Sequence, residues 1–219
     1  MSERIINIII DSFPKILVSG IMFTIPLTIC AFAIGVVFAF VIAIIQYKNI
    51  RVLNAFCRFY IWIFRGTPLL VQLFIVFYGL PNVGIVLPPF AAAVIVFSLN
   101  EGAYAAESIR AALTSIDRGQ LEASLMVGLT YRQSLVRIII PQALRTVFPV
   151  LFNEIISMVK DTSLAANITV AEMFMTTQRI VARTYEPLVL YIEVGVLYLI
   201  FSTVLTYVQR KGEAVLSKW

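Results

Sequence analysis

The sequence predicts an all-α integral membrane protein with five transmembrane helices. Hydrophobic residues make up 60% of the 219 residues and charged residues only 13%, whereas soluble domains are roughly 45 to 50% apolar. Residues 16–47 form a run of 32 residues without a charge. As a helix this run would extend about 48 Å, beyond the ~30 Å hydrocarbon core of a bilayer. We therefore expect residues 1–219 to form a single transmembrane domain that begins with a tilted or projecting helix.

The first predicted transmembrane helix, residues 16–47, is expected to stay in the protein. Its apolar run is longer than the roughly 7 to 15 residues of a cleavable signal peptide. The segment before it carries charges of both signs, at Glu3, Arg4, Asp11 and Lys15, rather than a basic cluster. We therefore expect the N-terminal segment to be retained.

The next charge-free run, residues 66–100, predicts two helices rather than one. It is 35 residues long and is divided by the turn-forming stretch from Gly79 to Gly84. We expect helices over 52–79 and 89–113, joined by an apolar external loop. A fourth helix is predicted over 138–160 and a fifth over 186–209. A short helix at the outer surface is expected near residues 168–175.

The distribution of positive charge favours an external N-terminus and a cytoplasmic C-terminus. In that orientation 11 of the 17 Lys and Arg residues face the cytoplasm and five face outward, with Arg65 inside the membrane. Basic residues concentrate on the cytoplasmic side of membrane proteins. The same orientation places the loop over residues 117–137 in the cytoplasm.

The composition excludes several classes of function. The absence of histidine removes His-based catalysis, His-ligated metal sites and haem. Cys30 and Cys57 lie in separate apolar segments and suggest neither a disulfide nor a metal cluster. No phosphate-binding loop of the G-x-x-x-x-G-K-[ST] type occurs, so any ATPase must be another polypeptide. The basic residues lie at helix ends, which argues against nucleic-acid binding. We expect no catalytic residue, metal or cofactor in this chain.

The loop over residues 117–137 contains a predicted short helix. Asp117 can cap its N-terminus with Gln120 three residues on, and Gly128 stands where a helix usually ends. Leu121 and Leu125 lie one turn apart and predict a narrow apolar stripe. A helix this short is not stable alone, so we expect it to need a partner surface.

Several motifs resemble the permease subunits of ABC importers for polar amino acids. Glu122-Ala123-Ser124, Gly128 and the Ile138 to Pro141 segment match the cytoplasmic EAA loop of those permeases, with Ser124 where many carry Ala. The segments 65–72, 103–107 and 160–164 are also similar to the histidine, glutamine and arginine permease-like family. The resemblance implies that the loop helix docks in a cleft of an ATPase subunit. The implied coupling residues are Gln120, Leu121, Glu122, Ala123, Ser124, Leu125 and Gly128.

The same resemblance implies a type I ABC-importer fold of five transmembrane helices that works as a pair in a bacterial inner membrane. It implies two ATPase subunits that carry ATP and Mg, a second permease subunit, an external solute-binding protein and an amino acid substrate. The pair would be a homodimer or a heterodimer, and we favour the homodimer.

Polar residues on the fourth predicted helix are candidates for a substrate path. Asn153, Glu154, Ser157, Lys160 and Asp161 follow a spacing that gathers residues on one helix face. Ionisable residues at membrane depth cost roughly 2.5 to 3.5 kcal/mol each, so they are expected to face a cavity or a partner. The alternative is that they join helices, with Lys160 paired to Asp161.

Arg65 and Glu101 are expected at similar depth. They could form an ion pair, which we favour, or line the cavity with Asn100, where Arg65 would meet a substrate carboxylate. Glu107 and Arg110 are expected to pair on the helix surface, and Glu193 has no assigned role. The predicted substrate-binding set is Arg65, Asn100, Glu101, Glu154, Ser157, Lys160 and Asp161.

The charges in this set lean acidic, which favours a basic amino acid over a neutral or acidic one. An unpaired buried carboxylate is expensive unless a cation visits it. Lys160, or backbone amides near Thr162, would then receive the substrate's α-carboxylate.

Two other classes of function remain open from the sequence. A channel or secondary carrier independent of ATP would share the polar helix face, but would not need the loop helix. An intramembrane hydrolase would need Ser157 or Ser163 with Lys160 as a Ser-Lys dyad. The three-residue spacing of Ser157 and Lys160 on one helix, and the lack of an oxyanion loop, argue against it.

Overall fold

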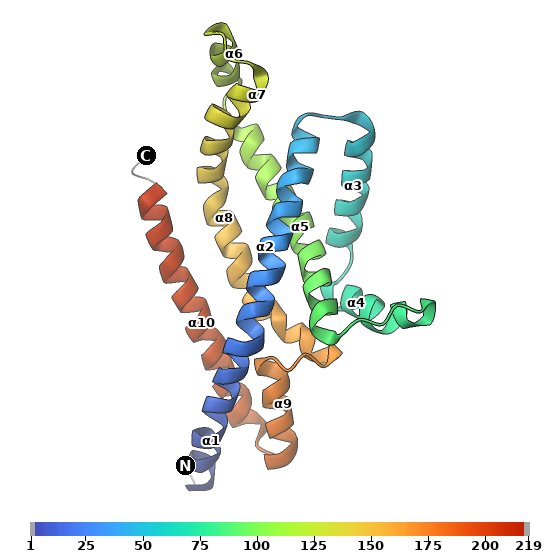
Figure 1. The fold of residues 1–219 in the computed structure, drawn as a ribbon. Coiled ribbons are helices and arrows are strands. Elements are labelled where there is room, and N and C mark those ends of the chain that lie inside the picture. The colour runs from blue at the N-terminus through green and yellow to red at the C-terminus, as the bar shows by residue number, and fades with distance from the viewer. Residues whose placement is uncertain (1–2, 217–219) are drawn as a thin grey trace.

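The computed structural model describes residues 3–216 and is a bundle of long helices with no strand among those residues (Figure 1). Lys218, which belongs to the predicted cytoplasmic charges, lies outside the described residues. Four helical segments are each long and apolar enough to cross a membrane: residues Glu3–Tyr47, Pro89–Ser115, Tyr131–Ile168 and Pro187–Leu216. A fifth crossing is counted when the bent pair Arg51–Gly66 and Leu69–Val83 is taken as one. The predicted all-α membrane fold is confirmed.

The first helix is longer than the predicted 16–47 and runs continuously over 45 residues. It comprises α1 (Glu3–Ser19), a π-helical turn η1 (Gly20–Thr24) and α2 (Ile25–Tyr47). Pro26 lies two residues after the end of the π-helical turn. A proline has no backbone N–H to donate, so the regular i to i−4 ladder cannot continue through it, and a local widening of the helix results. The N-terminal part of this helix projects beyond the α2–α5 core (Figure 1).

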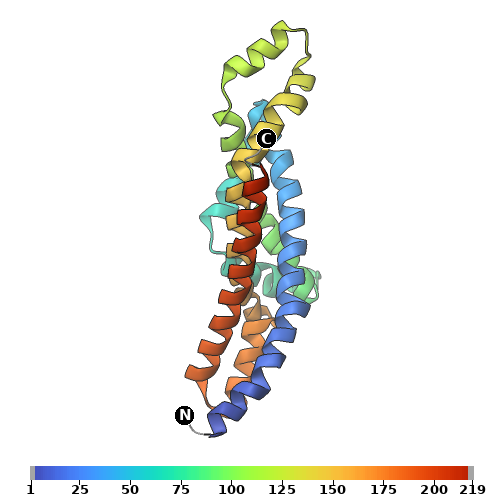
Figure 2. The same cartoon turned by 90° about the vertical axis from the view of Figure 1, so that its left-hand side faces the viewer.

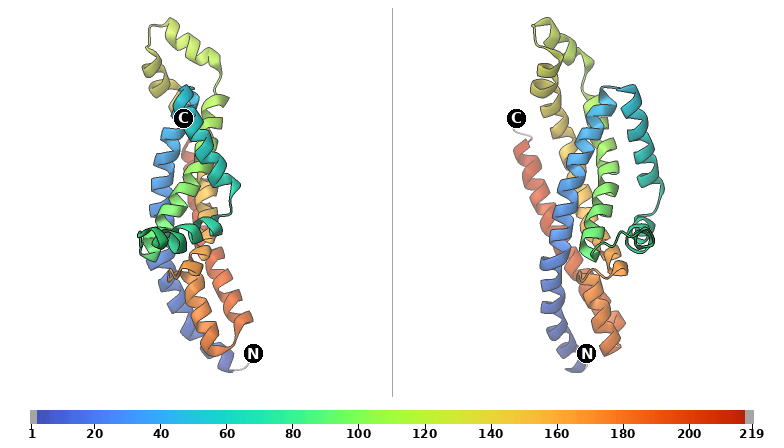
Figure 3. Two further views of the ribbon diagram at one scale, coloured as in Figure 1. Left: turned by 90° about the vertical axis from the view of Figure 1, so that its right-hand side faces the viewer. Right: turned by 45° about the vertical axis from the view of Figure 1, so that its right-hand side comes forward.

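The second crossing is bent by 103° rather than straight over 52–79 as the sequence suggested. The helix α3 (Arg51–Gly66) ends before Thr67 and Pro68, which are both extended, and α4 (Leu69–Phe74) then runs across the bundle (Figure 3). The residue before a proline avoids the helical region, which explains the break. The π-helical turn η2 (Ile75–Gly79) and the 3₁₀ helix η3 (Leu80–Val83) follow α4.

The next helices build the centre of the bundle. The helix α5 (Pro89–Ser115) leads to the loop helix α6 (Arg118–Met126) and to α7 (Tyr131–Ser134). The π-helical turn η4 (Leu135–Ile139) joins α7 to α8 (Ile140–Asp161), which contains Pro149. The α6–α7 segment projects at the end of the molecule opposite the N-terminus (Figure 2).

The outer segment differs from the expected short helix at 168–175. The 3₁₀ helix η5 (Thr162–Ile168) ends before this stretch, and α9 (Met173–Thr184) begins inside it and runs well past it. The last helix, α10 (Pro187–Leu216), packs on α8, α9 and α1.

Small residues bring α2 and α5 into close contact. Ala31, Ala39, Ala103 and Ala106 are fully buried at or beside this interface. A Cβ atom on Gly35 would lie 3.0 Å from Glu101 Cβ and 3.1 Å from the carbonyl oxygen of Ser98. Small side chains let membrane helices approach until their backbones touch. The position of Glu101 is therefore set by the backbone of α2.

Candidate functional site

A cavity of about 500 Å³ opens between α5, α8 and the α3–α4 turn. Its wall carries three carboxylates and no Lys or Arg side chain among the described residues. It is lined by Thr67, Pro68, Leu69, Asn100, Glu101, Tyr104, Val150, Asn153, Glu154, Ser157, Asp161 and Leu164.

The polar face of α8 contributes Asn153, Glu154, Ser157 and Asp161 to this wall. The helical spacing thus brings together four of the five residues that it was expected to gather. Lys160 does not join them. It lies with Phe174, Tyr191 and Tyr198 in a separate apolar hollow, because consecutive residues on a helix point about 100° apart.

A Ser-Lys dyad is not formed in the described part of the chain. Ser157 lines the acidic cavity, whereas Lys160 lines the other hollow. Ser163 shares the hollow with Lys160, but no hydrogen bond joins these two side chains. The arrangement therefore offers no activated nucleophile.

Glu101 and Glu154 face each other across the cavity, from α5 and α8. Both side chains line this cavity, and Glu101 is only 8% exposed. Ser108 donates a hydrogen bond to Glu154 Oε1 over 2.8 Å. Glu101 Oε1 and Glu154 Oε2 are buried and receive no N–H or O–H donor from the described residues. Two acceptor atoms are thus left open at the cavity wall.

Arg65 and Glu101, which are both described in the structure, do not form the predicted ion pair. The Arg65 guanidinium carbon instead lies 5.1 Å from the centroid of the Tyr104 ring, a cation–π contact. Tyr104 lines the cavity, whereas Arg65 does not. The depth estimate assumed straight helices, and α3 ends immediately after Arg65 at the bend. Glu107 and Arg110 do pair as expected, at 2.8 Å.

Gln72 has a structural role that sequence reasoning missed. Its Nε2 donates to the carbonyl oxygens of Phe64 and Thr67, over 2.9 and 3.1 Å. Its Oε1 accepts a hydrogen bond from Asn100 Nδ2 over 3.1 Å. Backbone carbonyls freed by a broken helix need such partners inside a membrane. Gln72 therefore holds the α3–α4 turn against α5. A lone Gln four residues after a Pro in an apolar run was the available signal.

The loop helix α6 begins and ends where predicted. Asp117 Oδ1 accepts a hydrogen bond from the Gly119 N–H over 2.6 Å. Gly128 has φ +88°, and its N–H and that of Leu129 bond to the last carbonyls of the helix. Gln120 has a different partner from the one expected, since its Oε1 accepts from Gln142 on α8 over 2.9 Å. The complete capping box of this loop lies at Thr130 and Gln133.

The predicted apolar stripe of α6 is divided between two surroundings. Leu121 is half-buried against the core of the bundle and Ser124 is buried. Leu125, Met126 and Val127 are exposed by 44%, 90% and 80%. The other members of the predicted coupling set are exposed as well: Gln120, Glu122, Ala123 and Gly128. The free apolar surface is thus Leu125-Met126-Val127 rather than Leu121 with Leu125.

Glu172 joins two helices at the end of the molecule opposite α6 (Figure 1). It is fully buried and caps α9 by accepting hydrogen bonds from the N–H groups of Phe174 and Met175, over 2.8 and 2.7 Å. The Tyr198 hydroxyl of α10 donates to it over 2.7 Å. Burial raises the pKa of Glu172, and the backbone and Tyr198 donors act in the lowering direction. This one side chain therefore ties α9 to α10.

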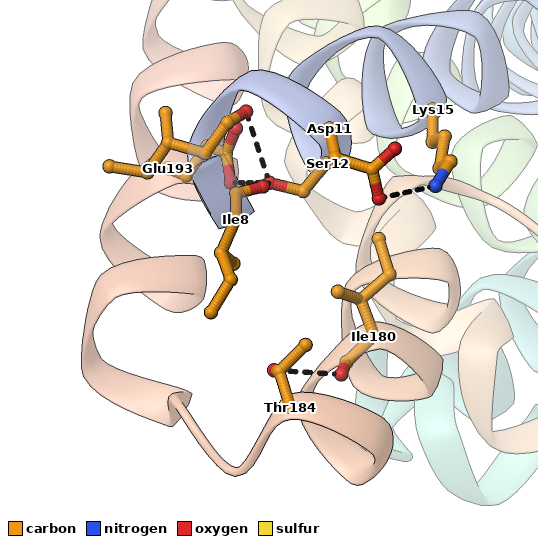
Figure 4. A network of polar contacts seen from close by, with 8 residues as sticks. Ile8, Asp11, Ser12, Lys15, Ile180, Thr184 and Glu193 are labelled. Carbon is orange, nitrogen blue, oxygen red and sulfur yellow. Dashed lines mark hydrogen bonds and ion pairs between the residues drawn. The ribbon is translucent and has the colours of Figure 1, made fainter. Parts of the chain in front are cut away.

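Glu193, which had no predicted role, joins α10 to α1. Its Oε2 lies 2.6 Å from Ser12 Oγ, and Ser12 also bonds to the Ile8 carbonyl oxygen over 2.8 Å (Figure 4). It lies outside the acidic cavity and is a polar contact between helices.

The long helices, the acidic cavity between them and the projecting loop helix define a membrane permease. The model of the family "binding-protein-dependent transport system inner membrane component" matches residues 32–213. This chain belongs to that family. It is the transmembrane subunit of an ABC importer, has no ATPase motif of its own and couples to a separate ATPase.

Individual relatives agree with this placement. The chain is 45% identical to the L-cystine transport system permease TcyB of Bacillus subtilis, over 97% of this chain and 92% of the relative. It is 33% identical to the arginine transport system permease ArtQ of B. subtilis, over 93% of both. A crystal structure of an amino acid ABC transporter with histidines has a TM-score of 0.89 at 32% identity and covers 98% of this chain and 99% of its own.

The exposed apolar end of α6 provides a test of the coupling surface. Leu125→Asp should lower substrate-stimulated ATP hydrolysis by about tenfold or more, because burying an unpaired carboxylate in an apolar groove costs over about 1.4 kcal/mol. The thermal unfolding temperature of the permease should stay unchanged, since Leu125 touches solvent. Leu121→Asp, one turn away, should instead lower that temperature. Full ATPase stimulation by a folded Leu125→Asp complex would contradict docking through this surface.

Proposed function

We propose that this chain forms the translocation pathway for basic amino acids, with Glu101 and Glu154 receiving the cationic side chain. The observation that carries the proposal is the cavity wall, which has three carboxylates, no Lys or Arg, and two buried carboxylate oxygens without a donor. A guanidinium or ammonium group supplies the missing donors and the opposite charge together. The cavity volume lies within the range of small-molecule sites.

The substrate's α-amino acid end needs donors elsewhere on the wall. Lys160 lines a neighbouring hollow and not the cavity, so it does not fill the role that the sequence suggested. Asn153 and Ser157 line the cavity beside Glu154, and their side chains donate no hydrogen bond within the described part of the chain. We assign the α-carboxylate to these two side chains. Asp161 lies on the same helix face and lines the same cavity. In this arrangement the α-ammonium group of the substrate would lie next to Asp161.

Relatives named for arginine and nopaline transport support a cationic substrate. L-cystine is the second candidate, because the permease TcyB is 45% identical to this chain. Cystine carries two ammonium groups, so an acidic cavity is compatible with it. The two candidates differ in what lies far from the α-carbon: a permanent cation in arginine, and a second zwitterion in cystine.

The complete importer would contain two copies of this chain, two ATPase subunits that bind ATP and Mg, and an external solute-binding protein in a bacterial inner membrane. The family description names dependence on a binding protein. Purification of a tagged copy should bring down an untagged copy of the same chain. Recovery of a different permease in its place would establish a heterodimer.

Neutralising Glu154 tests the cationic assignment. Glu154→Gln keeps the shape of the side chain and removes its charge. The concentration of arginine that half-stimulates ATP hydrolysis should rise about 10- to 100-fold, because a charge-assisted hydrogen bond contributes about 1.5 to 3 kcal/mol. The value for a neutral amino acid should change little. Glu193→Gln, a membrane carboxylate outside the cavity, is the matched control and should behave like wild type. Unchanged stimulation by arginine in Glu154→Gln would refute the assignment.

The orientation is proposed as N-terminus outside and C-terminus in the cytoplasm, on the charge distribution given above. Met126 is 90% exposed on the α6 end, and Tyr185 is 83% exposed after α9. In a chain without Cys30 and Cys57, a membrane-impermeant thiol reagent should label Tyr185→Cys in intact cells. It should label Met126→Cys only after permeabilisation. The opposite pattern would invert the topology.

A further inference from the structure

The pair Glu101 and Glu154 lacks a counter-charge in the empty cavity. Glu101 is more than nine-tenths buried, its Oε1 has no donor, and it lines the cavity. Glu154 has one oxygen occupied by Ser108 and the other unpartnered. Two carboxylates on the wall of one buried cavity repel each other when both are ionised and poorly hydrated.

The charged groups around this pair do not neutralise it. Asp161 of α8 adds a third negative charge on the same wall. Arg65 of α3 stacks on Tyr104, which lines the cavity, but it forms no ion pair among the described residues. Lys160 acts on Asp161 from the neighbouring hollow.

The other packed elements supply only neutral contacts. The hydroxyl of Tyr60, on α3, donates a hydrogen bond to the Leu99 carbonyl oxygen over 2.5 Å. Gln72 of α4 is bonded to Asn100. Gly35 of α2 has no Cβ atom, and this leaves room for the Cβ and Cγ atoms of Glu101. The α2 backbone therefore limits the space available to the Cβ and Cγ of Glu101.

We propose that the empty cavity holds one proton shared between Glu101 and Glu154, and that a cationic substrate displaces this proton when it binds. The inference rests on the proposed function, because only a substrate with a positive side chain replaces the charge of the proton. The O–H bond of the carboxyl group breaks and its electron pair stays on oxygen. The proton passes to water in the open cavity, and N–H groups of the substrate then donate to both carboxylates. Nothing is oxidised or reduced.

Exchange of one cation for another has a consequence for selectivity. The buried pair with its shared proton carries a net charge of −1, and the pair with the substrate cation in place of the proton carries the same net charge. A neutral amino acid cannot release the proton, since its departure would leave two adjacent carboxylates uncompensated. The shared proton therefore stabilises the site before substrate binds. It also lowers the affinity of the site for uncharged amino acids.

Proton release can be measured directly on the permease assembled with its ATPase in lipid nanodiscs. L-arginine is titrated calorimetrically at one pH in phosphate and in Tris, whose ionisation enthalpies differ, and the difference in binding heat gives the protons released. We expect up to about one proton per permease subunit in wild type at a pH where the pair holds its proton, and close to none in Glu101→Gln. Glu193→Gln should release as many as wild type.

The dependence of affinity on pH gives a second readout that needs no variant. Where the proton is held, the Kd for arginine should fall by about tenfold per pH unit as pH rises, and it should level off once the pair is ionised. Arginine binding with no proton release and no such slope between about pH 5 and pH 9 would overturn the shared proton and leave the proposed function standing. Failure of wild type to bind arginine at any pH would overturn both.

Discussion

The close contact between α2 and α5 is the constraint on which the rest of the structure depends. Gly35 leaves no side chain between the two helices, so the stem of Glu101 lies directly on the α2 backbone. This contact fixes α5, which presents Asn100 to the α3–α4 turn and Glu101 to α8. Lipid provides no hydrophobic drive for helix association, so such packing must come from shape. The acidic cavity is the space left when α8 packs on a helix held in this way.

The same helices connect the two ends of the molecule. The helix α5 leads from the cavity to the short link before α6, and α8 returns from α7 to the cavity. Gln142 of α8 also bonds to Gln120 of α6. The exposed Leu125-Met126-Val127 surface is therefore connected to Glu101 and Glu154 through α5 on one side and α8 on the other. Asp117 and Gly128 cap the two ends of α6 and stabilise that short helix.

Helical spacing predicted the part of the site that depends on one regular helix. Asn153, Glu154, Ser157 and Asp161 lie together because α8 is continuous there. Predictions across two elements were less successful. The pairing of Arg65 with Glu101 assumed a straight helix, whereas the extended backbone at Thr67 and Pro68 ends α3. Lys160 was predicted on the same helix face as these four residues, but it lies on a neighbouring face of α8.

The loop helix shows the same limit. Its ends follow from Asp117 and Gly128, which act locally through their own backbone. Which apolar side chains are free depends on distant packing, and Leu121 turned out to face the bundle. The partners of Gln72 and Glu193 likewise lie on other elements, so a single sequence does not identify those partners.

A structure of the assembled importer with bound L-arginine tests the central claim most directly. The account predicts density for the guanidinium group between Glu101 and Glu154, with the α-carboxylate beside Asn153 and Ser157. Arginine bound with its guanidinium away from both glutamates, or an empty cavity at saturating arginine with the ligand in the hollow of Lys160, would contradict it.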